Sequence, residues 1–192
     1  MKATEKIPVS QTPAEELPSC SRIIRRRRNT AEIRSGYIRL VVDIAALAVI
    51  GILLFTQVFL VMQAPGNGMF PAIKDGDLII GFRLQGEYLK DDVVVYEADG
   101  ETHVGRIMGR ETDVITMDDT GTLLVNGTVQ GGEILFPTYP EDGMEYPYTV
   151  PEGYVFILGD YRTQAVDSRE YGSIPIENVK AKVITILRRR QL

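Results

Sequence analysis

The sequence predicts a mainly β protein, with an antiparallel β domain outside a membrane and one N-terminal transmembrane helix as its anchor. Residues 44–62 form nineteen consecutive positions without a charge, a length that as a helix spans the apolar core of a bilayer, about 30 Å thick. After residue 62 the sequence changes to short runs rich in β-branched side chains, separated by Gly, Asp and Pro. Such alternation of short apolar runs and turn residues is typical of strands in an antiparallel sheet.

The distribution of charge predicts which side of the membrane each part occupies. Residues 1–37 carry eight Lys/Arg and four Asp/Glu, whereas residues 63–192 carry twelve Lys/Arg and twenty-one Asp/Glu. Because cationic segments stay on the cytoplasmic side, we expect a single-pass protein of the cell membrane with a cytoplasmic N-terminus. The predicted parts are a flexible basic tail (1–37), a transmembrane signal-anchor helix (38–62) and an extracellular β domain (63–192).

Three alternatives for the N-terminal part are less favoured. A cleavable signal peptide would have its apolar stretch nearer the N-terminus. The run Arg25–Arg28 could contact nucleic acid, but its position before the apolar segment favours a role in topology, so no nucleic-acid partner is expected. Cys20 is interpreted as an ordinary thiol, with lipidation as the weaker alternative.

The β domain is predicted from seven runs and the turns between them. Asn126-Gly127-Thr128 matches the acceptor pattern for glycosylation, but Asn-Gly between two strands favours a hairpin turn. Residues 131–150 are expected to form a long loop, and residues 176–179 one helical turn. The predicted strands are Leu78–Phe82, Asp92–Glu97, Thr102–Met108, Asp113–Met117, Thr122–Val125, Tyr154–Leu158 and Ala181–Leu187.

Composition excludes several kinds of site. One Cys rules out an intramolecular disulfide framework and any Cys-x-x-Cys metal or redox motif, and one His leaves little for a zinc site. We therefore expect no metal and no cofactor.

Several blocks of sequence follow the apolar segment in a fixed order. They are Gly66–Ile73 with Asp75–Ile79, Lys90–Tyr96, His103–Gly109, Asp113–Ile115, Leu124–Gly127 and Gly159–Gly172. This order resembles the bacterial type I signal peptidases, which are membrane-anchored serine proteases that trim signal peptides outside the membrane. The first block is similar to their Ser-Met-x-Pro box, the third to Tyr-Val-Lys-Arg, and the last to Gly-Asp-Asn-Arg-x-x-Ser-x-Asp-Ser-Arg. The resemblance implies their antiparallel β fold.

The chain departs from the family pattern at the positions that carry the chemistry. The resemblance implies a nucleophilic Ser where this chain has Gly68, a general-base Lys where it has Gly105, and a Lys-orienting Ser where it has Ala165. A hydroxyl attacks a peptide carbonyl only if a neighbouring group takes its proton. Loss of one member of such a unit costs on the order of 10⁴-fold in rate. No catalytic residue is therefore assigned.

Other residues of the β domain do not replace the missing groups. Its serines are Ser168 and Ser173, and both lie in or beside the last block. His103 shares a strand face with Gly105 two residues on, so it is weighed as a base but favoured as a strand residue that lines the cleft. A structural role is expected for the polar residues of the last block, Asp160, Arg162, Asp167, Ser168 and Arg169.

These observations leave three hypotheses about function. The preferred one is a non-catalytic chaperone that binds an extended peptide, like the signal-peptidase-like proteins of pilus assembly in Gram-positive bacteria, with a surface protein or pilin, and also a sortase, as partners. The alternatives are an active signal peptidase I that removes signal peptides from secreted proteins and a structural membrane protein without a peptide ligand. For Met69, a core role and a groove role are equally favoured. The predicted peptide groove comprises Gly68, Met69, Phe70, Pro71, His103 and Gly105.

Overall fold

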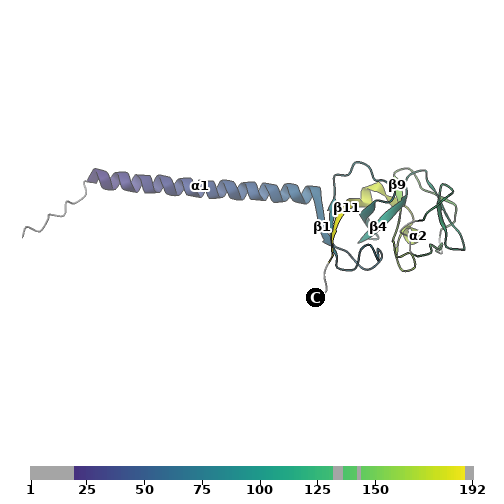
Figure 1. The fold of residues 1–192 in the computed structure, drawn as a ribbon. Coiled ribbons are helices and arrows are strands. Elements are labelled where there is room, and N and C mark those ends of the chain that lie inside the picture. The colour runs from purple at the N-terminus through teal and green to yellow at the C-terminus, as the bar shows by residue number, and fades with distance from the viewer. Residues whose placement is uncertain (1–19, 132–135, 142–143, 189–192) are drawn as a thin grey trace, which may run out of the picture. The chain divides into compact units, whose positions relative to one another are not determined.

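The computed structural model describes residues 20–131, 136–141 and 144–188. It contains one long helix and a β domain of two antiparallel sheets (Figure 1). The chain divides into two compact units, residues 1–51 and residues 52–192. The mainly β fold predicted from the sequence is confirmed.

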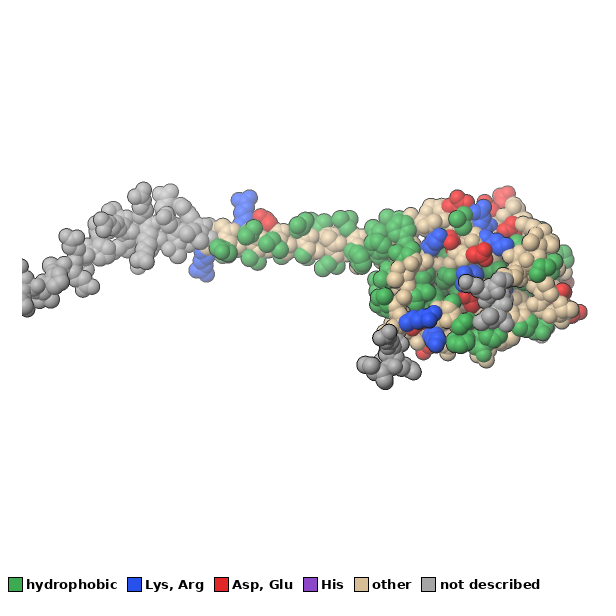
Figure 2. All heavy atoms as spheres, viewed as in Figure 1, with side chains coloured by type: hydrophobic (Ala, Val, Ile, Leu, Met, Phe, Trp, Pro, Cys, Tyr) green, Lys and Arg blue, Asp and Glu red, His purple; other side chains and the backbone are tan. Residues whose placement is uncertain are grey.

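Helix α1 covers Cys20–Val58, and its part from Gly36 to Val58 is long and apolar enough to cross a membrane. None of this stretch is buried by the rest of the protein, and Figure 2 shows hydrophobic side chains along its visible face. At 1.5 Å per residue, its 23 residues extend about 35 Å, enough for the apolar core of a bilayer. These properties are consistent with membrane anchoring.

The predicted C-terminal boundary of the transmembrane helix, Met62, is wrong by four residues. Helix α1 ends at Val58, and β1 (Phe59–Gln63) pairs antiparallel with β2 (Leu78–Phe82), with Phe59 opposite Phe82. Hydropathy cannot distinguish the end of an apolar helix from an apolar strand. The strand forms because residues 78–82 supply it with backbone partners that are distant in the sequence.

The larger sheet has seven strands in the order β1-β2-β11-β3-β4-β9-β10. The smaller sheet has four, in the order β7-β6-β5-β8. All seven strands predicted from the sequence are present, with ends shifted by no more than two residues. The strands not yet given are β3 (Val93–Ala98), β4 (Glu101–Gly109), β5 (Val114–Met117), β6 (Leu123–Val125), β7 (Thr128–Val129), β8 (Tyr148–Thr149), β9 (Tyr154–Leu158), β10 (Ile174–Pro175) and β11 (Val179–Leu187).

Two short helices and one short strand lie outside the seven predicted strands. The helical turn expected at residues 176–179 is the 3₁₀ helix η1 (Ile176–Asn178). Helix α2 (Ser168–Tyr171) has no periodic signal in the sequence and begins at the cap residue Asp167, whose side chain accepts from the amide of Arg169. The long loop predicted for residues 131–150 contains strand β8, which pairs with β5; residues 132–135 and 142–143 lie outside the described residues.

The Asn-Gly pair forms the hairpin turn favoured by the sequence. Asn126 and Gly127 have φ values of 52° and 75°, the left-handed conformation that a tight hairpin turn between β6 and β7 requires. The Asn126 side chain accepts from the Val114 amide (2.8 Å) and donates to Asp113 (2.7 Å). The side-chain amide that glycosylation would modify is thus engaged in two hydrogen bonds.

Candidate functional site

The first block of the family pattern forms the turn that follows β1. The amide of Gly66 donates to the Asp75 carboxylate (2.8 Å), and the amide of Phe70 donates to the carbonyl of Asn67 (2.9 Å). These bonds fix the turn that carries Gly68. The Met69 side chain is 2% exposed and packs in the core with Ile73 and Ile79. Of its two possible roles, the structure therefore shows the core role.

Gly68 and Ala165 face each other across the start of the last block. A Cβ atom added to Gly68 would lie 3.7 Å from the Cβ of Ala165, an ordinary van der Waals distance. The amide of Tyr161 donates to the carbonyl of Gly68 (2.9 Å), which joins the two blocks. The structure thus brings together two positions that are nearly one hundred residues apart in the sequence.

Gly159 allows this close approach. A Cβ atom at this position would lie 2.3 Å from the Cβ of Ala165 and 2.6 Å from the carbonyl oxygen of Gly68. Only glycine fits here, because neither the Gly68 backbone nor the short Ala165 side chain can move out of the way of a Cβ atom. The residue that follows β9 therefore packs directly against Gly68 and Ala165.

Gly105 approaches the same end of β9 from strand β4. Its neighbour Arg106 lies opposite Leu158 in the register of the two strands. A Cβ atom on Gly105 would meet the Ile157 γ2 methyl at 2.5 Å and the Tyr96 ring at 3.2 Å. Both side chains are buried in the core of the larger sheet. The space that a side chain at position 105 would need is thus filled by apolar groups.

His103 lies on β4 two residues before Gly105. Its ring stacks on Tyr96, with centroids 5.5 Å apart, and contacts Tyr171 at the same distance. Its Nε2 atom is buried and has no hydrogen-bond partner among the described residues. Burial raises the pKa of Tyr96, and the charge of Asp167 raises it further. This arrangement places His103 in an aromatic stack, with no hydroxyl at Gly105 or Gly68 for it to activate.

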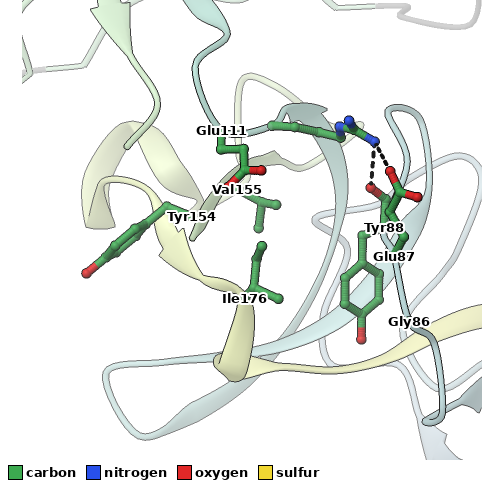
Figure 3. A pocket seen from close by; sticks show the side chains of 8 residues that line it. Gly86, Glu87, Tyr88, Glu111, Tyr154, Val155 and Ile176 are labelled. Atoms are coloured by element: carbon green, nitrogen blue, oxygen red, sulfur yellow. Dashed lines mark hydrogen bonds and ion pairs between the residues drawn. The ribbon is translucent and has the colours of Figure 1, made fainter. Parts of the chain in front are cut away.

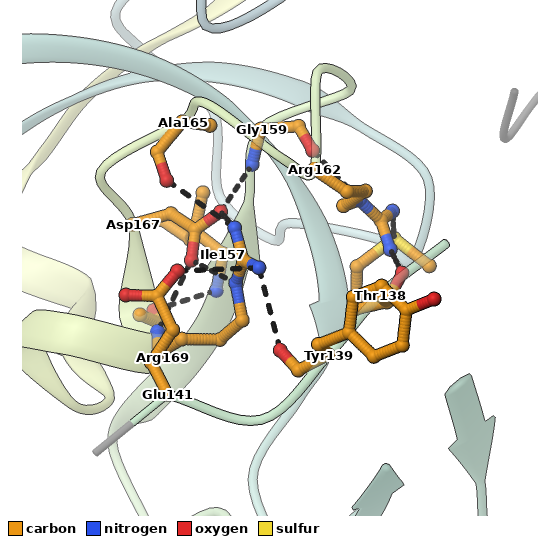
Figure 4. Close-up of polar contacts among 11 residues, drawn as sticks. Thr138, Tyr139, Glu141, Ile157, Gly159, Arg162, Ala165, Asp167 and Arg169 are labelled. Atoms are coloured by element: carbon orange, nitrogen blue, oxygen red, sulfur yellow. Dashed lines mark hydrogen bonds and ion pairs between the residues drawn. The ribbon is translucent and has the colours of Figure 1, made fainter. Parts of the chain in front are cut away.

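The last block is a network of paired charges (Figure 4). Asp167 is 1% exposed and accepts from the amide of Gly159 (3.0 Å) and from the Arg169 guanidinium (2.9 Å). Asp160 forms a two-bond ion pair with Arg106 of β4 at 2.8 and 2.7 Å. The pairing of buried charges in this way holds the block against β4 and β9.

Two further polar residues of this block also bond within the domain. Arg162 is 1% exposed and donates to the carbonyl of Gly159 (2.7 Å) and to the hydroxyl of Thr138 (2.7 Å). Burial lowers the pKa of Arg162 to about 10. The hydroxyl of Ser168 is fully buried and accepts from the amide of Ile157 (2.9 Å). Ser168 is thus inaccessible to a peptide, and the hydroxyl of Ser173 is buried too.

A separate surface pocket of about 280 Å³ shares no residue with these positions (Figure 3). At its rim Arg110 pairs with Glu87 (2.7 Å). Sequence reasoning does not predict this pocket, because its residues come from four separate segments. They are Gly86, Glu87, Tyr88, Arg110, Glu111, Tyr154, Val155 and Ile176.

Comparison with known proteins identifies the family. Residues 37–187 match the family model described as signal peptidase, peptidase S26. The chain belongs to this family. No group of His, Cys, Asp or Glu able to hold a metal ion occurs among the residues that the structure describes.

The relatives extend from bacteria to organelles. The chain is 34% identical over 60% of its length to the probable thylakoidal processing peptidase 2 of Arabidopsis thaliana, covering 34% of that protein. It is 31% identical over 54% of its length to signal peptidase I of Bacillus licheniformis, covering 62% of it. It is also 27% identical to subunit 1 of the mitochondrial inner membrane protease of Schizosaccharomyces pombe, over 78% of this chain and 87% of that one. The chain thus spans about a third of the length of the plant relative and less than two thirds of the B. licheniformis one.

Among solved structures, the chain is similar to a signal peptidase I from Enterococcus faecalis. The TM-score is 0.44 at 24% identity, and the match covers 52% of this chain and 97% of that one.

Proposed function

We propose that this membrane-anchored signal peptidase relative binds an extended peptide without cleaving it. The observation that carries the proposal is the site at the end of β9. Gly68 and Ala165 face each other without a hydroxyl, and the place of a side chain at Gly105 is taken by Ile157 and Tyr96. A site with neither nucleophile nor base cannot perform acyl transfer, whereas its backbone can still pair with a peptide.

The proposed ligand is an extended segment of a surface protein or pilin, with a sortase as a further partner. What supports a peptide ligand is membership of the signal peptidase family, together with the absence of a hydroxyl or amino group at Gly68 and Gly105. We also propose that the N-terminus is cytoplasmic and that residues 63–192 lie outside the cell membrane. The seven arginines between residues 22 and 39 support this orientation, because cations flanking a transmembrane helix remain in the cytoplasm.

A second candidate function is active signal-peptide cleavage, which the names of the relatives favour. The two candidates differ in the outcome of a cleavage assay. The full chain in detergent is incubated with a preprotein that bears a small-x-small site, with signal peptidase I of Bacillus licheniformis as positive control. We expect no cleavage by the unmodified chain. Cleavage that persists after repurification would overturn the non-catalytic proposal.

The same assay tests whether the filled site is what prevents activity. We compare Gly68→Ser/Gly105→Lys/Ala165→Ser with a variant that adds Ile157→Ala. Because the Ile157 methyl occupies the path of a side chain at position 105, the added substitution is expected to be needed for any restored cleavage.

Binding is measured by fluorescence anisotropy of a labelled peptide that contains the small-x-small site. We expect saturable binding to the full chain and its loss in Gly68→Phe, which fills the space between Gly68 and Ala165. Gly86→Phe is the matched control, because open space surrounds that glycine. Equal binding by both variants, or none by the unmodified chain, would contradict a groove at Gly68.

A further inference from the structure

Three aromatic rings from separate segments meet beside Gly68. Phe70 lies in the turn after β1, Phe136 in the segment between β7 and β8, and Tyr161 in the last block. The rings of Phe136 and Tyr161 have centroids 4.5 Å apart, and those of Phe70 and Tyr161 are 5.8 Å apart. We refer to these three rings as the aromatic shelf.

The shelf borders the proposed peptide groove directly. The amide of Tyr161 is hydrogen-bonded to the carbonyl of Gly68, and Phe70 follows Gly68 by two residues. Phe70 is 37% exposed, although it is a large apolar side chain. Its exposed ring therefore lies next to the path of a peptide that crosses Gly68.

A cation accompanies the shelf. The amino group of Lys74 lies 5.8 Å from the centre of the Phe70 ring. Within the described residues, the Lys74 side chain forms no ion pair with a carboxylate. Residues 63–192 carry nine more acidic than basic side chains, so cations such as Lys74 are the groups that can attract a carboxylate of a ligand to this domain.

We propose that the shelf and Lys74 form a subsite for an aromatic side chain next to a carboxylate in the bound peptide. The aromatic side chain packs on Phe70 and Tyr161, where ring pairs add to the gain from apolar burial. The adjacent carboxylate approaches the Lys74 ammonium group, which orients the peptide and disfavours basic sequences. This inference rests on the proposed function, since it names the chemistry that the same groove selects.

The test uses labelled twelve-residue peptides and the full chain in detergent. Each peptide contains Ala-Gln-Ala, and a Phe-Glu pair is placed in turn at every position within four residues on either side. The reference peptide has Ser-Ser in place of the pair. We expect binding about tenfold tighter than the reference for at least one placement, as a single good ring contact with a charge pair provides.

Variants of the shelf connect this gain to particular residues. Phe70→Ala and Tyr161→Ala should remove the tenfold gain, so that each variant binds the Phe-Glu peptide and the reference peptide with equal affinity. Tyr154→Ala is the matched control, because Tyr154 is also 37% exposed but lines the separate pocket. Phe70→Leu, which keeps apolar volume without a ring, serves if Phe70→Ala does not fold.

A charge exchange tests the role of Lys74. Lys74→Glu should lose the preference for Phe-Glu and bind the corresponding Phe-Lys peptide more tightly instead. If all peptides bind all variants equally, the subsite is wrong and the proposed function stands. If the unmodified chain binds neither the pair-bearing peptides nor the reference, both fail.

Discussion

Two regions that meet at the end of β9 differ in how their polar groups are used. In the last block, Asp160 and Asp167 bind Arg106 and Arg169, and each contact lies within hydrogen-bond distance. In the region around Gly68 and Gly105, the side chains that meet are apolar or absent. The paired charges of Asp160, Arg106, Asp167 and Arg169, called the framework from here on, contrast with Gly68, Gly105 and Ala165, which carry no polar side-chain group.

The comparison teaches that a framework of paired charges can surround positions that carry no polar side chain. A buried charge that loses its partner carries a large desolvation penalty, so each charged residue of the last block depends on its partner. A glycine or alanine at positions 68, 105 and 165 brings no polar side-chain group that would need a partner. Neighbouring apolar groups then close the space, as Ile157 does at Gly105.

The largest expected effect comes from breaking the framework. Asp167→Ala removes the buried acceptor of Arg169 and of the Gly159 amide. The buried guanidinium keeps only Glu141, a partly exposed carboxylate 3.3 Å away, as its ion-pair partner. We expect a loss of about 3–5 kcal/mol in the free energy of unfolding. Because the chain has no Trp, denaturation of the full chain in detergent is followed by near-ultraviolet circular dichroism of its tyrosines.

An exposed ion pair provides the control for Asp167→Ala. Glu87 pairs with Arg110 at 2.7 Å, but its side chain is 70% exposed. Glu87→Ala should change stability by less than about 1 kcal/mol. Equal losses in the two variants would show that burial of the Asp167 pair does not matter.

A smaller effect is expected from adding one methyl group to the filled region. Gly105→Ala places a Cβ atom 2.5 Å from the Ile157 methyl and should destabilise the domain by about 1–3 kcal/mol through overpacking. In an Ile157→Ala background the same substitution should cost much less. A double-mutant cycle of unfolding free energies measures this coupling.

Two other glycines sharpen the test at Gly105. Gly68→Ala has ordinary contact distance to Ala165, and Gly86→Ala enters open space. Neither should destabilise by more than about 0.5 kcal/mol, the range of substitutions that create no strain. A loss at Gly86 as large as that at Gly105 would remove the steric explanation.

The next substitution removes a buried hydroxyl that has no hydrogen-bond partner among the described residues. The Tyr146 hydroxyl is buried and forms no hydrogen bond among the described residues. Tyr146→Phe should therefore stabilise the full chain at pH 7 by about 1 kcal/mol, since an unmet hydroxyl carries a desolvation penalty. A lower free energy of unfolding in Tyr146→Phe than in the unmodified chain would show that this hydroxyl has a partner in the folded protein.

The sequence predicted the strands better than the site. Seven strands follow from β-branched runs and turn residues, because each signal is local. The apolar residues of strand β1 match a helix as well as a strand, and only their pairing with residues 78–82 decides between the two. No periodic pattern indicates helix α2, because its single turn depends on the cap at Asp167.

The site could be predicted as positions but not as a space. The resemblance predicts that Gly68, Gly105 and Ala165 stand where the family has its nucleophile, its base and the Ser that orients the base. That Ile157 fills the place beside Gly105, and that Phe136 reaches Tyr161, depends on contacts between distant segments. No periodicity or spacing carries this information.

The smallest expected effect is a difference in alkaline sensitivity between the unmodified chain and Tyr146→Phe. Burial raises the pKa of Tyr146 to about 12 from the ordinary value of 10. Between these values the unfolded chain has lost the proton that the folded chain keeps, so stability falls as the pH rises from 10 to 12. Denaturation midpoints at pH 8 and pH 11 should therefore differ less in Tyr146→Phe.

Arg162 contributes in the opposite direction in this experiment. Burial lowers its pKa to about 10 from 12.5, so above pH 10 the unfolded chain holds the extra proton and stability rises. Because Arg162 is present in both proteins, its contribution cancels when their two pH differences are subtracted. If the fall in denaturation midpoint from pH 8 to pH 11 is the same in both proteins, the Tyr146 hydroxyl titrates alike in the folded and unfolded chain. If the midpoint falls further in the unmodified chain than in Tyr146→Phe, burial of the Tyr146 hydroxyl reduces stability at alkaline pH.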